Sequence, residues 1–291
     1  MKLSPGFKFL LGFVGILIIS AVTAPLLALW LPFAFPRVLS RIVLILTVSW
    51  LVLFISKSGG FDLRKYGLVW EQGSSRRLLQ GLLLGFGILL VMSLIEIPFG
   101  VRAWQFTFGQ TVWPLKILKY LFSALFIGLF EEFLFRGLLF RTFSPRIRLI
   151  PALFLTNIIY SLSHFLRYSG TDTFPHPDFF SSLQVYGSIL APFMRPGDIW
   201  PGAIGLFLFG MVLSYGYLRT ENLILSIGLH AGAVFFLKMD RWFIHVETEQ
   251  HKIWFGGTDL HASVVGWVFI LLMGVGVRLI LGGKQLIGRR V

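Results

Sequence analysis

Residues 115–140, LKILKYLFSALFIGLFEEFLFRGLLF, form an apolar run that carries Glu131, Glu132 and Arg136 in its second half. A helix that spans a bilayer needs about 20 mostly apolar residues, and this run is long enough. A charged side chain at the bilayer centre costs about 2.5–3.5 kcal/mol on insertion scales, so such charges are usually paired and functional. The sequence therefore predicts a membrane helix that contains a functional site.

Helical spacing separates the roles of these charges. Glu132 and Arg136 are four residues apart with the carboxylate first, which is the favourable order for an ion pair within a helix. Glu131 projects about 100° away around the helix and must find a partner on another helix. We therefore expect a structural pair, Glu132 with Arg136, and a separate Glu131 available for chemistry.

The composition is that of a polytopic membrane protein. Of the 291 residues, 56% are hydrophobic and 13% are charged, which leaves little polar sequence for a separate soluble domain. The absence of cysteine excludes disulfides, thiol catalysis and cysteine-ligated metal. The net charge of +13 is spread over loops and termini, which indicates membrane orientation rather than nucleic-acid binding. The distribution of Lys and Arg predicts that both termini are cytoplasmic, in a multi-pass protein of a bacterial-type inner membrane.

The apolar runs predict an all-α fold, a membrane helix bundle of about eight transmembrane helices. We find no internal repeat or linker, so we expect a single membrane domain over residues 1–291. Glu96, beside Pro98 at a predicted helix end, is expected to reach the membrane interface as a structural residue. The expected spans are residues 7–31, 38–56, 78–98, 115–140, 149–168, 199–218, 223–238 and 262–281.

Two of the later apolar runs carry a polar stripe with members three or four residues apart. These members are Asn157, Tyr160 or Ser161, and His164 in the first stripe, and Asn222, Ser226 and His230 in the second. Two histidines on two helices thus accompany Glu131. Such a set can do general acid–base work on a water, or it can hold a divalent metal with two His and one carboxylate. The alternatives are that the histidines only pack and that the stripes only join helices.

Three short motifs resemble those of a known family. EEFLFR at 131–136 fits EExxxR, Tyr160 to His164 approaches FxxxH, and His230 begins a third motif that continues to Val234. Together they resemble the CPBP family, also called Abi, which includes CAAX proteases, bacteriocin-processing enzymes and the type II CAAX prenyl endopeptidases. The resemblance covers residues 115–237, where we expect the family's catalytic core.

The resemblance implies an intramembrane endopeptidase that hydrolyses a membrane-anchored or lipidated protein or peptide with an activated water. It assigns Glu131 as general base, His164 as its partner in positioning the water, and His230 as oxyanion donor. Glu132 and Arg136 become the supporting ion pair. No cofactor is favoured, and the alternative is zinc held by the same Glu and two His.

Two residues depart from the family pattern. Tyr160 replaces Phe, and Val234 replaces an Asn or Asp that in the family helps to stabilise the oxyanion. Asn157 or Asn222 would then be the auxiliary amides. The Val234 change also supports a non-catalytic scaffold or immunity protein. A proton-coupled transporter is a third alternative, because buried Glu and His also mark ion pathways.

Overall fold

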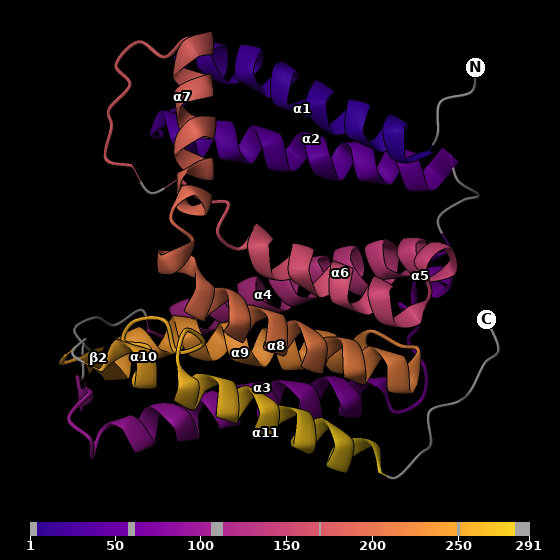
Figure 1. Ribbon diagram of the computed structural model, residues 1–291, viewed down its shortest axis with the longest axis vertical. Coiled ribbons are helices and arrows are strands. Elements are labelled where there is room, and N and C mark those ends of the chain that lie inside the picture. Colours follow the sequence, from indigo (N-terminus) through magenta and orange to yellow (C-terminus); the bar gives the residue numbers. More distant parts are fainter. Residues whose placement is uncertain (1–4, 58–61, 106–112, 169, 249–250, 283–291) are drawn as a thin grey trace. The chain divides into compact units, whose positions relative to one another are not determined.

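The computed structural model describes residues 5–57, 62–105, 113–168, 170–248 and 251–282 (Figure 1). The chain divides into two compact units. The first contains residues 1–62 and 165–197, and the second contains residues 63–164 and 198–291. The single membrane domain expected from the sequence stays a prediction.

The described part of the first unit contains three α-helices and the short helix η3 (Ala191–Met194). Helices α1 (Pro5–Ala28) and α2 (Phe35–Lys57) pack side by side, and α7 (Phe179–Leu190) contacts both. Helix α7 begins at a capping box in which the Asp178 carboxylate accepts a hydrogen bond from the Ser181 backbone N–H at 2.7 Å. This cap sets the start of α7 after the loop that leads from the second unit.

The second unit contains the predicted functional stretch. Helix α9 lies beside both α3 and α4, and α11 lies beside α3 (Figure 1). The elements of this unit are η1 (Leu63–Tyr66), α3 (Ser74–Glu96), β1 (Arg102–Trp104), α4 (Trp113–Glu132), η2 (Phe133–Phe140), α5 (Arg141–Ile147), α6 (Leu149–Ser163), α8 (Pro196–Thr220), α9 (Ile224–Phe243), β2 (Ile244–Val246), α10 (Lys252–Phe255) and α11 (Val264–Leu281).

Helices α3 and α9 touch through glycines, which lets the two backbones approach closely. A Cβ atom added at Gly85 would lie 2.2 Å from the backbone oxygen of Leu229. One added at Gly232 would lie 2.1 Å from the backbone oxygen of Leu82. Neither space can hold a methyl group unless a backbone moves. Because Gly232 is two residues from His230, this contact fixes the part of α9 that carries a predicted site residue.

Gly85→Ala is therefore expected to destabilise the protein by about 1–3 kcal/mol, because overpacking pushes α3 away from α9. The matched control is Gly87→Ala on the same helix, where an added Cβ meets nothing within 4 Å. We expect that change to leave stability equal or slightly higher. The thermal unfolding midpoints of both variants in detergent are the measurement, and equal midpoints would contradict the close-contact interpretation.

The number of membrane spans differs from the sequence expectation. Within the described residues, four helical segments are long and apolar enough to cross a membrane: Leu11–Ala28, Ser74–Glu96, Pro196–Thr220 and Val264–Leu281. The expected eight spans are not confirmed, because α6 is a short helix and α4 carries Lys and Glu residues within its length. The fold is also nearly, rather than wholly, α-helical. Strands β1 and β2 pair antiparallel, and three-residue strands leave no readable alternation in the sequence.

A buried ionic network joins the ends of α3 and α9 to this small sheet. Arg102 in β1 donates to the Glu96 carboxylate at 2.6 Å, to Asp240 at 2.8 Å and to the Gly257 carbonyl at 2.7 Å. Glu96 is fully buried, so the expectation that it reaches the interface is wrong. A helix end next to a proline does not reveal that an arginine six residues later folds back over it.

Candidate active site

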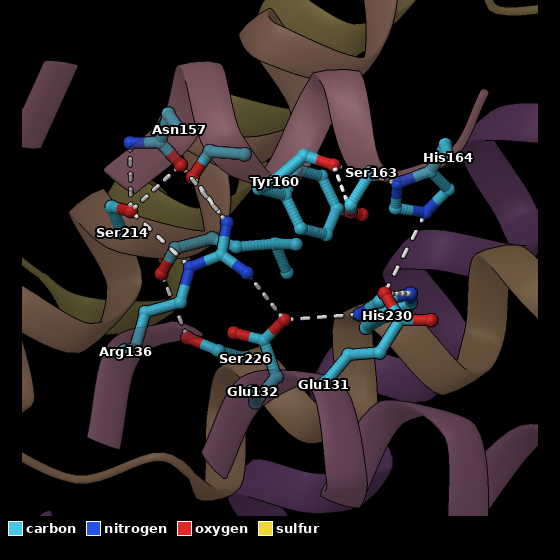
Figure 2. Close-up of polar contacts among 12 residues, drawn as sticks. Glu131, Glu132, Arg136, Asn157, Tyr160, Ser163, His164, Ser214, Ser226 and His230 are labelled. Carbon is cyan, nitrogen blue, oxygen red and sulfur yellow. Dashed lines mark hydrogen bonds and ion pairs between the residues drawn. The ribbon is translucent and has the colours of Figure 1, made fainter. Parts of the chain in front are cut away.

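The predicted site residues come from three helices of the second unit. Glu131 and Glu132 end α4, and the chain continues as the π-helix η2, which carries Arg136. His164 caps the C-terminus of α6, and His230 lies within α9. Figure 2 shows their side chains pointing toward one another. π-Helical segments are rare in proteins, and many of those known lie at functional sites, in agreement with the position of η2.

Glu131 lies between the two histidines. Its Oε2 is 3.6 Å from His164 Nε2 and 3.8 Å from His230 Nε2. This oxygen is buried and has no hydrogen-bond partner among the described residues. The structure thus brings together the three residues expected to act on substrate. It leaves one carboxylate oxygen of Glu131 unsatisfied at their centre.

The Nδ1 atoms of both histidines already donate hydrogen bonds within the protein. His164 Nδ1 lies 2.8 Å from the backbone oxygen of Tyr160, and His230 Nδ1 lies 3.0 Å from Glu132 Oε1. A carbonyl and a carboxylate can only accept, so each Nδ1 carries the hydrogen. A neutral imidazole then presents a lone pair at Nε2. Three acceptors, Glu131 Oε2 and the two Nε2 atoms, therefore converge, and a molecule with two O–H donors would satisfy two of them.

Glu132 connects the ion pair to the site. Its Oε1 accepts from Arg136 at 2.9 Å as well as from His230, and Glu132 and Arg136 are both fully buried. The expected pair is thus present, but it also orients a site histidine. The four-residue spacing could reveal only the pair, because the link to His230 spans 98 residues of sequence.

Arg136 also ties the polar residues of α6 and α8 together. It donates to Asn157 Oδ1 at 3.1 Å, to the Gly210 carbonyl at 2.9 Å and to Ser214 Oγ at 3.3 Å. Ser214 was not among the residues singled out from the sequence, since a lone serine in an apolar helix carries no signal of its own. These hydrogen bonds fix the Arg136 guanidinium in contact with Glu132.

The two amides expected as auxiliary residues are occupied elsewhere. Asn157 accepts from Arg136 and donates to the Leu153 carbonyl at 2.9 Å. Asn222 precedes α9, where it donates to the Val69 carbonyl at 2.8 Å and accepts from the Ile224 N–H at 3.0 Å. The structure places Asn157 in the supporting network and Asn222 at the helix start, about 12 Å along the axis from His230 at 1.5 Å per residue.

The ring of Tyr160 contacts both site histidines. Its ring centre is 4.6 Å from that of His164 and 6.2 Å from that of His230, in edge-to-face contacts. The Arg136 guanidinium lies over the same ring, 4.6 Å from its centre. Tyr160 is fully buried, whereas Val234, one turn after His230, is only partly buried.

The residue types at the site are those that bind zinc. Glu131, His164 and His230 would be the ligands of such an ion. Within the part of the chain that the structure describes, no group of three His, Asp or Glu residues is placed to hold a metal ion.

Comparison with known proteins places the site within a family. Residues 113–236 match the family model of the type II CAAX prenyl endopeptidases, Rce1-like. This segment is close to the 115–237 expected from the motifs, and it contains Glu131, His164 and His230. No curated protein and no solved structure matches the chain. The match and the four apolar helices establish an integral membrane protein in the lipid bilayer. The match over residues 113–236 thus supports a membrane protease of the CPBP family.

Proposed function

We propose that this protein is an intramembrane endopeptidase that hydrolyses a peptide bond in a membrane-anchored or lipidated protein or peptide. The observation that carries the proposal is the unsatisfied Glu131 Oε2 between two imidazole Nε2 atoms. A site that offers only acceptors suits a water, which needs acceptors for both hydrogens. The name of the matched family suggests the prenylated class of substrate.

In this reaction a water donates one hydrogen bond to Glu131 and the other to His164 Nε2. Glu131 takes the first proton as the water oxygen attacks the carbonyl carbon, and the carbonyl electrons move to oxygen. His230 faces the reacting group from α9. It donates from Nε2 only as the imidazolium, with the Glu132 carboxylate as the partner of its Nδ1–H. The intermediate then collapses as the C–N bond breaks, and Glu131 returns its proton to the leaving amine.

We propose that these steps need no metal ion. Activity of the purified protein in excess EDTA or 1,10-phenanthroline is expected to equal that of the untreated protein, because the water is polarised by Glu131 and His164 alone. The measurement is the cleavage rate before and after dialysis against chelator. A loss of activity that zinc restores would contradict this part of the proposal.

The test of the function itself compares peptide termini in the membrane proteome of cells with the wild-type protein or Glu131→Gln at equal abundance. Defined termini that vanish in the variant would support proteolysis and identify both substrate and cleavage site. Identical sets of termini would contradict it.

A second candidate function is a non-catalytic scaffold, and the observation that favours it is Val234. Its side chain offers no hydrogen bond where the family motif has an amide or carboxylate. Identical termini together with a phenotype on deletion of the whole protein would favour this reading. The cytoplasmic placement of both termini stays a proposal, since residues 1–4 and 283–291 lie outside the described residues.

A further inference from the structure

One end of the second unit is strongly basic. We call it the basic end, and it consists of residues 63–77, 141–148 and 217–221. Arg141 joins the three segments, because it donates hydrogen bonds to the Lys65 carbonyl and to the Tyr217 hydroxyl. Side chains of all three also belong to one apolar cluster or pack against it. In Figure 1 this end holds α5 and the C-terminal end of α8. The three segments therefore form one surface.

The charge of the basic end is unbalanced. It contains eight basic and two acidic side chains, which gives a net charge of +6, and Asp62 just before it lowers this value only to +5. The opposite end of the unit holds the other ends of α3, α8 and α9. There six basic and five acidic side chains give a net charge of +1, over residues 96–104, 113–120, 196–198, 238–247 and 252–259.

Exposed apolar side chains lie beside these charges. Leu63 and Trp70 flank the exposed Lys65, and their side chains are 41% and 65% exposed. Ile150 follows the exposed Arg148 and is 66% exposed. Segments that lie in a membrane interface combine these features, because apolar side chains enter the acyl boundary while cations reach the lipid phosphates. Membrane orientation requires only enough Lys and Arg in the loops, and it does not require exposed apolar side chains next to them.

Two helices begin at the basic end without a negative charge in their first turn. Helix α3 has Arg76 there and no acidic residue, and Arg148 precedes α6 without capping it through its side chain. Glu71, the nearest carboxylate in sequence to α3, pairs with Arg77 at 2.8 Å. A helix N-terminus carries a partial positive charge, so Arg76 and Arg148 add to it. An anion from outside the chain would offset both.

We propose that the basic end binds the phosphate groups of anionic phospholipids, with Leu63 and Trp70 in the acyl boundary of the same leaflet. A free phosphate would use the cations alone, whereas a phospholipid also uses the exposed apolar side chains. The surface is coupled to the fold around the active site. The ring of Tyr66 packs edge-on against that of Phe133, the residue after Glu132, with ring centres 5.6 Å apart. Bound lipid should therefore stabilise the folded protein.

The test follows the thermal unfolding midpoint of the full-length protein in detergent while phosphatidylglycerol or phosphatidylcholine is added. Phosphatidylglycerol is expected to raise the wild-type midpoint more than phosphatidylcholine does. The variant Lys65→Gln/Arg76→Gln/Arg148→Gln removes three exposed cations. It is expected to need about tenfold more phosphatidylglycerol for half of the maximal rise. Without anionic lipid its midpoint should be equal to that of the wild type or slightly higher, because Arg76 no longer lies at the positive end of α3.

The matched control is Lys116→Gln/Lys119→Gln/Arg241→Gln, which removes the same charge from exposed positions at the opposite end. It should respond to phosphatidylglycerol as the wild type does. Equal responses of the wild type and the basic-end variant would overturn the inference, and so would an equal loss in both variants. Inorganic phosphate at the same concentration should give no rise, and a rise as large as that with phosphatidylglycerol would show a free-phosphate site instead. None of these measurements needs activity, so they stand apart from the outcome for Glu131→Gln.

Discussion

Replacing Glu131 by glutamine is expected to lower kcat about a thousandfold, within the range that general base catalysis contributes, while the protein stays folded. Glutamine has the same shape but cannot take a proton from water. Glu131 holds no short ion pair, since its nearest imidazole nitrogen is 3.6 Å away. Its loss therefore strands no buried partner. The measurement is single-turnover cleavage in proteoliposomes together with the unfolding midpoint.

Glu247→Gln is the matched control. That carboxylate follows β2 directly, is half exposed and pairs with His245 at 2.9 Å, so the same chemical change is made in the same unit outside the site. It should keep wild-type kcat. Full activity of Glu131→Gln would show that another group activates the water, and inactivity through loss of folded protein would show that Glu131 is structural.

Replacing Arg136 by alanine is expected to destabilise the protein by about 3–5 kcal/mol, because it leaves the buried carboxylate of Glu132 without its cation. It also removes the donors that satisfy Asn157, the Gly210 carbonyl and Ser214. The free energy of unfolding in detergent and the amount of folded protein in the membrane both measure this. Arg146→Ala, an exposed arginine of α5, should change stability by less than about 0.5 kcal/mol.

A double variant tests whether the stranded charge is the cause. Arg136→Ala combined with Glu132→Gln removes the charge with its partner, so it should be more stable than Arg136→Ala alone. The same double variant should still lose activity, since Gln holds His230 less firmly than a carboxylate does. Equal stability of the single and double variants would mean that the arginine acts through Asn157 and Ser214 instead.

The convergence of Glu131, His164 and His230 can be predicted because a charged or polar side chain in an apolar helix must find partners on other helices. The spacing of three or four residues within each polar stripe then shows which side chains share a helix face. The three motifs show the order of the site residues along the chain. The Glu132–Arg136 pair follows from spacing alone. Each of these inferences concerns a single helix. They combine because a polar side chain inside the membrane needs a partner on another helix.

The contacts that cannot be predicted link elements far apart in sequence. The bond from His230 to Glu132 depends on how α9 is rotated against α4, which no spacing within either helix records. The burial of Glu96 depends on Arg102 folding back from a three-residue strand. The count of spans fails for a related reason. Apolar length does not separate a helix that crosses the bilayer from a short helix such as α6.

The glycine contact between α3 and α9 means that the segment matched by the family model does not contain all of its own packing partners. Residues 113–236 include His230 but not α3, whose Gly85 leaves room for the α9 backbone. A chimera that carries this segment on the remaining helices of a distant relative would contain Glu131, His164 and His230. It would lack the α3 surface against which α9 packs. The helix of the relative that corresponds to α3 would also need small residues at matching positions. We therefore expect working chimeras only between proteins that are similar in this helix as well.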